Sequence, residues 1–136
     1  MWTLPWRRSV VCPFHPTSSA TTVRRRVIFK VIGTANKRDD FTRDAFFDYW
    51  MNVHAPISMK APGLRGYVVS EATRRLQGSL EVDAFVEQWF DSEAAFVAAS
   101  ESSEVADAWA DVPNYAKLTG SFWVVHEHVI IPPPRP

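Results

Sequence analysis

The stretch Phe46-Phe47-Asp48-Tyr49-Trp50-Met51-Asn52-Val53-His54-Ala55-Pro56 decides the fold of this chain. Thr42 precedes it as a plausible N-cap, and Asp44 places a negative charge in the first turn, where the helix dipole favours it. The sequence Ala61-Pro62-Gly63 ends the segment. Apolar side chains recur between these limits at helical spacing, at Phe46, Trp50, Val53 and Ile57. The pattern predicts one helix with a broad aromatic face packed on a core.

Four segments rich in β-branched and aromatic residues surround this helix and are predicted to be strands. The polar residues 74–79 read as a hairpin connection, so the two strands that they join are expected to be antiparallel. Gly33 is expected to end the first strand, and the run of prolines from Pro132 to end the last. The predicted strands are residues 26–32, 64–73, 83–91 and 122–131.

A second helical region lies between the last two strands. Ser92 reads as an N-cap with Glu93 just inside the helix, and residues 103–109 also look helical. The order is therefore β-α-β-β-α-β, the ferredoxin-like α+β arrangement, with a four-stranded antiparallel sheet carrying helices on one face. Because the other face is then bare and rich in aromatic residues, we expect it to be covered by a second copy in a homodimer.

Length and composition exclude several classes of protein. The chain has 136 residues, enough for one domain, with 46% hydrophobic and 22% charged residues, which is the balance of a globular protein. Its single cysteine, Cys12, can form neither an intramolecular disulfide nor a zinc finger. No apolar run approaches the roughly 20 residues of a membrane span. We therefore expect a cytoplasmic protein.

The charges are divided unevenly along the chain. Residues 1–26 hold five arginines and no acid, so the remainder carries ten basic residues against all fifteen acids. An acidic body argues against nucleic acid or an anionic membrane as its partner. Prolines interrupt residues 1–25, which are predicted to be a disordered extension. The alternatives are a start codon assigned too far upstream and an organellar targeting peptide. Residues 26–131 form the predicted domain, and residues 132–136 a Pro-rich tail.

His54 is the residue that points most directly to chemistry. It lies near the end of the predicted helix, where Pro56 lacks the N–H that would bond the carbonyl of Asn52 and so leaves a polar helix end. A neutral imidazole is a general base near pH 7, and the negative end of a helix favours its protonated form. A packed or solvated histidine is the alternative. We expect His54 to lie in a cleft and not in the core.

Cofactor chemistry finds little support in the sequence. His126 and His128 alternate with Glu127 in the last predicted strand and would share one face, but they are too few for a predicted metal site. No Walker, Rossmann or G-x-S-x-G pattern is present. We therefore predict that no cofactor is bound. The simplest interpretation of the aromatic residues is that they form the core, but a cleft that binds a ring compound would be lined by the same residue types. The residues in question are Trp50, Tyr67, Trp89, Trp109, Tyr115 and Trp123.

Three motifs together resemble the EthD family, over about residues 26–131. They are the opening stretch ending in His-Ala-Pro, the segment Pro62-Gly63-Leu64-Arg65-Gly66-Tyr67, and the segment Val86-Glu87-Gln88-Trp89-Phe90-Asp91-Ser92. The resemblance implies a dimeric α/β-barrel, in which two ferredoxin-like halves join through their sheets. Relatives include methylmuconolactone isomerases, in which a histidine at the position of His54 lies in the ligand cleft. The cysteine that some of these isomerases carry in the strand matching residues 86–89 is absent here.

The resemblance and the residues together favour a small cofactor-independent enzyme that transfers protons on an apolar, cyclic carbonyl compound, as an isomerase, cyclase or dehydratase would. His54 is the expected general acid/base, and the expected substrate-binding residues are Trp50, Tyr67, Trp89 and His128. One alternative is an oxidoreductase or a protein that assists an oxygenase. The other is a ligand-binding or stress-response dimer without turnover, because a fold does not by itself determine function.

Overall fold

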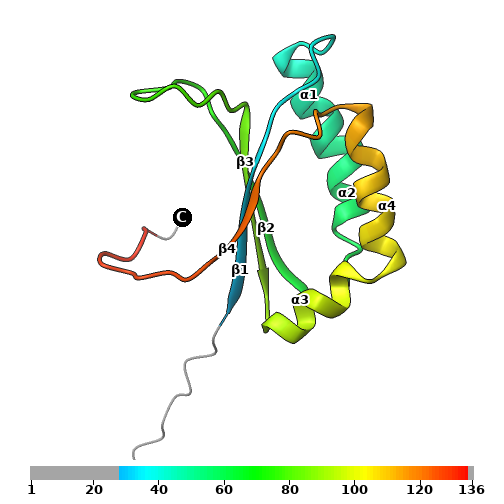
Figure 1. Ribbon diagram of the computed structural model, residues 1–136, viewed down its shortest axis with the longest axis vertical. Coiled ribbons are helices and arrows are strands. Elements are labelled where there is room, and N and C mark those ends of the chain that lie inside the picture. Colours follow the sequence, from blue (N-terminus) through cyan, green and yellow to red (C-terminus); the bar gives the residue numbers. More distant parts are fainter. Residues whose placement is uncertain (1–27, 135–136) are drawn as a thin grey trace, which may run out of the picture.

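The computed structural model describes residues 28–134, so the predictions for residues 1–25 lie outside the described part of the chain. Its four strands form one antiparallel sheet in the order β2-β3-β1-β4. Helices cover one face of this sheet, and no helix of residues 28–134 packs on the other (Figure 1). The strands are β1 (Phe29–Ala35), β2 (Leu64–Glu71), β3 (Ala84–Phe90) and β4 (Phe122–Val125). The predicted ferredoxin-like α+β fold is confirmed.

The predicted first helix is a succession of three helical segments: α1 (Arg43–Tyr49), a π-helical turn (Trp50–His54) and α2 (Ala55–Ser58). After β3 come α3 (Glu93–Ser100) and α4 (Ser103–Asp111), followed by a 3-10 turn (Val112–Asn114). None of the helices in the described part of the chain is long and apolar enough to cross a membrane.

Side-chain caps fix where the helices begin. The hydroxyl of Thr42 accepts a hydrogen bond from the backbone N–H of Ala45 at 3.1 Å, and Ser92 caps α3 in the same way. Both caps are visible in the sequence because they need only a hydroxyl three residues before an available N–H. Ser102 caps α4 and so separates it from α3.

Two strands differ from their predicted limits. The first continues through Gly33 to Ala35, because a glycine there leaves room for the ring of Phe122, which lies across it from β4. The last strand ends at Val125 and not at residue 131. Val125 pairs with Lys30, and since β1 begins only one residue before Lys30, little partner strand remains for the residues that follow.

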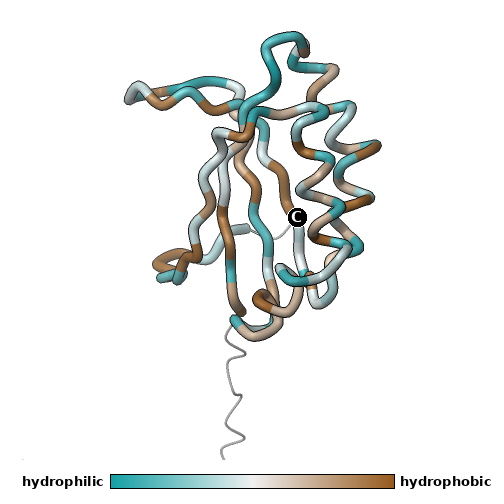
Figure 2. The backbone as a smooth tube through the Cα atoms, turned by 45° about the vertical axis from the view of Figure 1, so that its right-hand side comes forward, coloured by the Kyte–Doolittle hydropathy of each residue, from teal (hydrophilic) through white to brown (hydrophobic). Residues whose placement is uncertain are grey.

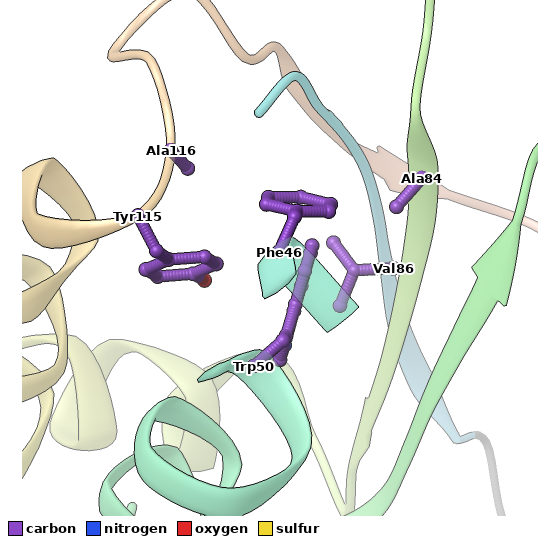
Figure 3. Packing of buried hydrophobic residues seen from close by; sticks show 6 residues of the cluster. All are labelled: Phe46, Trp50, Ala84, Val86, Tyr115 and Ala116. Carbon is purple, nitrogen blue, oxygen red and sulfur yellow. The ribbon is translucent and has the colours of Figure 1, made fainter. Parts of the chain in front are cut away.

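The core lies between the sheet and the first helical segments (Figure 3). Phe46 is fully buried and Tyr115 is 2% exposed, and their rings stack with centroids 5.5 Å apart. Tyr115 follows the 3-10 turn, so this contact joins the second helical region to the first. The remaining core residues come from the π-helical turn, β3 and the position after Tyr115: Trp50, Ala84, Val86 and Ala116.

Apolar residues also mark the sheet face that the helices leave open. Hydrophobic colouring runs along the strands as well as along the neighbouring helices (Figure 2). Val68, Phe85 and Trp123 are 45%, 39% and 51% exposed, although they belong to regular strands. An exposed apolar face of this kind is unusual for a protein that stays monomeric.

Candidate functional site

A cavity of about 220 Å³ lies between the sheet and the helices. Its lining is largely apolar, which suits a small apolar or aromatic molecule. Polar residues also line it, among them His54, Ser58, Tyr67 and Gln88. The apolar lining includes Val31, Trp50, Phe90, Phe96, Trp109 and Phe122.

The π-helical turn positions His54 at this cavity. Within the turn, the backbone N–H of Ala55 bonds the carbonyl of Trp50, five residues earlier, so the helix is locally wider than an α-helix. His54 is the last residue of the turn and is only 6% exposed. Ser58 follows four residues later, on the same side of the helix, and is equally buried.

Asp111 at the end of α4 holds the imidazole of His54. Its Oδ2 lies 2.9 Å from Nδ1 of His54. Its Oδ1 accepts hydrogen bonds from the Tyr49 hydroxyl at 2.7 Å and from the side-chain amide of Asn114 at 3.0 Å. A carboxylate with these three donors is fully engaged, so it fixes both the ring orientation and the tautomer of His54.

The protonation states follow from burial and hydrogen bonding. Burial disfavours ionisation of Asp111, but the hydrogen bonds from Asn114, Tyr49 and His54 outweigh it and lower the pKa of the carboxyl. Burial lowers the pKa of His54 more than Asp111 raises it. At neutral pH the pair is therefore a carboxylate and a neutral imidazole that carries its proton on Nδ1. Nε2 is left as a free base.

Ser58 and Tyr67 continue the polar chain on the other side of the imidazole. The Ser58 hydroxyl lies 3.0 Å from Nε2 of His54, so it donates to this nitrogen. The Tyr67 hydroxyl accepts from Nε1 of Trp50 at 2.7 Å. Burial raises the pKa of Tyr67 and outweighs the hydrogen bond from the indole of Trp50, which opposes this rise. Tyr67 thus keeps its proton at neutral pH and can donate it.

The structure brings together three of the five predicted site residues. His54, Trp50 and Tyr67 all line the cavity. Trp89 does not, because its neighbour Gln88 faces the cavity and successive residues of a strand point to opposite faces. Trp89 instead lies beneath Lys30, whose Nζ is 4.7 Å from the ring centroid. Trp89 is therefore not part of the cavity that His54 lines.

His128 is also separated from the cavity. It follows the end of β4, so the prediction that His126 and His128 alternate within the last strand is wrong. Their rings contact each other with centroids 5.2 Å apart, and both residues are exposed. In residues 28–134 no three His, Cys, Asp or Glu side chains are grouped closely enough to hold a metal ion.

The prediction for His54 itself needs two corrections. His54 lines a cavity, as expected, but it is also buried and packs against Tyr115 with ring centroids 4.8 Å apart. The expected stabilisation of its protonated form by the helix end does not prevail, because burial lowers its pKa.

Sequence reasoning missed Asp111, Ser58 and Tyr49. Ser58 could have been found, because a residue four positions after a helical histidine shares its face. Tyr49 was noted only as part of an aromatic helix. Asp111 lies 57 residues from His54, and no local pattern distinguishes it from the other acids of α4.

Residues 38–119, which make up more than half of the chain, match the family model of the EthD domain. The chain belongs to the EthD family. A comparison with curated proteins finds no match. His54 lies within the matched segment.

Several solved structures share this fold. An ethyl tert-butyl ether degradation (EthD) family protein from Bacillus halodurans is 23% identical, with a TM-score of 0.64 over 74% of this chain and 99% of that one. A dimeric ferredoxin-like protein from Thermobifida fusca is 15% identical, with a TM-score of 0.54 over 72% and 91%. SnoaB from Streptomyces nogalater, a cofactor-independent oxygenase, is 8% identical, with a TM-score of 0.54 over 76% and 98%.

Proposed function

We propose that this EthD protein is a cofactor-independent enzyme that transfers protons on a small, apolar, cyclic carbonyl compound. The observation that carries the proposal is the Asp111–His54 pair at the wall of an apolar cavity. His54 is the general base and Asp111 its positioning residue. Isomerisation, cyclisation and dehydration all begin with such a proton transfer from carbon.

The site supplies each part that this chemistry needs. Nε2 of His54 is unprotonated at neutral pH and takes the proton from the carbon next to the carbonyl. A bound ligand displaces the Ser58 hydroxyl from Nε2 in order to reach it. The Tyr67 hydroxyl donates a hydrogen bond to the oxygen of the enolate that forms. Trp50 positions Tyr67 for this role by donating to its oxygen.

Deuterium exchange tests the proposal without knowledge of the natural substrate. The full-length protein is incubated in deuterated buffer with an enolisable cyclic ketone such as 2-tetralone, and loss of the α-proton signal is followed by proton NMR. A general base contributes about 10²–10⁴-fold to a rate, so His54→Gln should slow the catalysed exchange by that range.

His126→Gln is the matched control, because His126 is exposed and lies outside the cavity. It should exchange as fast as the unmodified protein. Equal exchange in His54→Gln and in the unmodified protein would contradict the role of His54. No exchange above the buffer rate, together with ketone binding by calorimetry, would instead favour the ligand-binding alternative.

A second candidate function is cofactor-free oxygenation, favoured by the likeness of the fold to the oxygenase SnoaB. The same deprotonation by His54 would give a carbanion that reacts with molecular oxygen. Oxygen uptake during turnover of a phenolic or quinone-forming substrate, measured with an oxygen electrode, separates this reaction from isomerisation.

We also propose that the protein works as a homodimer joined through the open face of its sheet. Val68, Phe85 and Trp123 provide exposed apolar surface there, and the similar protein from Thermobifida fusca is dimeric. Burial of this surface would contribute about 25 cal/mol for each Å² of apolar area.

A further inference from the structure

Three linked side chains, of which His54 and Ser58 line the cavity, have the relative arrangement of a serine-nucleophile site. The Oδ2 atom of Asp111 is 2.9 Å from Nδ1 of His54, and Nε2 of the same ring is 3.0 Å from the hydroxyl oxygen of Ser58. Such sites are recognised by the geometry and roles of the three groups, not by their order in the chain. The proton-transfer reaction proposed above leaves Ser58 without a chemical role.

The hydrogen bonding of Ser58 is unusual for a helical serine. A serine within a helix commonly bonds the carbonyl four residues earlier. Here its hydroxyl bonds the imidazole of the residue four positions earlier instead. Because His54 is neutral with its proton on Nδ1, Nε2 can take the hydroxyl proton of Ser58 as the oxygen attacks a ligand.

A donor for the developing negative charge lies beside Ser58. Tyr67 lines the same cavity as Ser58. Its oxygen already accepts the indole N–H of Trp50, so its own proton is directed elsewhere. An acyl group held at Ser58 would place its carbonyl oxygen within reach of this hydroxyl.

We propose that Ser58 is an acyl-accepting nucleophile, activated by His54 and Asp111, and that the cavity hydrolyses esters or lactones of small apolar acids. The Ser58 oxygen bonds to the acyl carbon while its proton passes to Nε2 of His54. The bond from that carbon to the leaving alcohol breaks, and the alcohol oxygen takes the proton from Nε2.

Water completes the cycle. Its oxygen bonds to the acyl carbon while one of its protons passes to Nε2 of His54. The bond between the acyl carbon and the Ser58 oxygen then breaks, and the proton passes from Nε2 to the Ser58 oxygen. An ester gives one carboxylic acid and one alcohol, and a lactone gives one hydroxy acid, so no oxidant or cofactor is consumed. Tyr67 stabilises the oxyanion in both steps.

The test uses p-nitrophenyl acetate and the full-length protein. We expect a burst of nitrophenolate and an acetyl group on the Ser58 peptide by mass spectrometry after acid quenching. Ser58→Ala should remove the acetylation and slow nitrophenolate release by about 10²-fold or more, and His54→Gln should do the same. Tyr67→Phe should slow release by about 10²–10³-fold, the effect of losing one oxyanion donor.

Ser79→Ala is the matched control, because Ser79 is exposed in the β2–β3 connection, and it should release nitrophenolate at the unmodified rate. Ser58→Cys keeps the shape of the side chain and should accumulate a thioester. This variant keeps the test informative if Ser58→Ala fails to fold. Acetylation elsewhere, or release that is independent of residue 58 in both variants, would overturn the proposal. Deuterium exchange that persists in Ser58→Ala would show that the proton-transfer function stands without it.

Discussion

The carboxylate of Asp111 and the imidazole of His54 meet at 2.9 Å, although 57 residues separate them in the chain. Asp111 comes from the last turn of α4 and His54 from the π-helical turn, so the pair forms only when these two helices pack side by side on the sheet. The pairing determines which nitrogen of His54 carries the proton, and therefore which nitrogen can act as a base on a ligand.

Asp111→Asn should inactivate the site and destabilise the protein. The amide would donate to Nδ1 of His54, which moves the ring proton to Nε2 and removes the free base. We expect deuterium exchange to fall by about 10²–10⁴-fold, and the free energy of unfolding to fall by about 1–3 kcal/mol through weaker bonds from Tyr49 and Asn114. Urea denaturation measures the second effect.

Asp107→Asn is the control for this variant, since Asp107 is exposed on the same helix. It should change neither quantity appreciably. Nitrogen-15 NMR of the imidazole should find the proton of His54 on Nδ1 in the unmodified protein and on Nε2 in Asp111→Asn. The same tautomer in both proteins would show that Asp111 does not control the base.

The lowered pKa of His54 predicts a loss of stability in mild acid. The ordinary pKa of histidine, 6.5, applies to the unfolded chain, and burial lowers the value in the folded protein. Below about pH 6.5 the unfolded state therefore binds the proton first, and the free energy of unfolding decreases until the pH passes the folded pKa. The pKa of Asp111 is also lowered, so its contribution is lost only at still lower pH.

Urea denaturation at pH 7.5, 6.5 and 5.5 measures this slope. His54→Gln should flatten it, because glutamine does not titrate, whereas His126→Gln should leave it unchanged. An equal slope in His54→Gln and in the unmodified protein would mean that another group causes the acid sensitivity.

The open face of the sheet predicts a change in assembly when a charge is placed on it. Phe85→Glu should convert the dimer into a monomer at micromolar concentration, because an unpaired carboxylate would be buried in the interface. Light scattering after size exclusion measures the mass. Val97→Glu is the control, since Val97 is 45% exposed on α3, in the helical layer. A monomeric mass for the unmodified protein would contradict the proposal that two copies join through their sheets.

We propose that residues 1–25 lie outside the domain. The first strand begins at Phe29, and the EthD match begins at residue 38. A chain that starts at Thr22 should therefore melt at the same temperature as the full-length protein, by circular dichroism. A decrease of several degrees would place part of this segment against the folded body.

Local patterns in the sequence were sufficient to predict the order of the helices and strands and to single out one candidate catalytic residue. Thr42 and Ser92 act through the N–H groups of their own helices, and the spacing of Phe46 and Trp50 depends only on helical geometry. His54 is marked by its neighbours in the chain, which carry the resemblance to the EthD family. Each of these inferences rests on residues within a few positions of one another.

The partners of His54 were decided by packing. Asp111 reaches it from a distant helix, and Tyr67 reaches the same cavity from β2. The face on which Trp89 lies was also decided by packing, because the composition of a strand does not reveal which of its two faces lines a cavity, and a shift of one residue exchanges the faces. Contacts between distant segments depend on how the helices and the sheet pack together, which local sequence patterns do not encode.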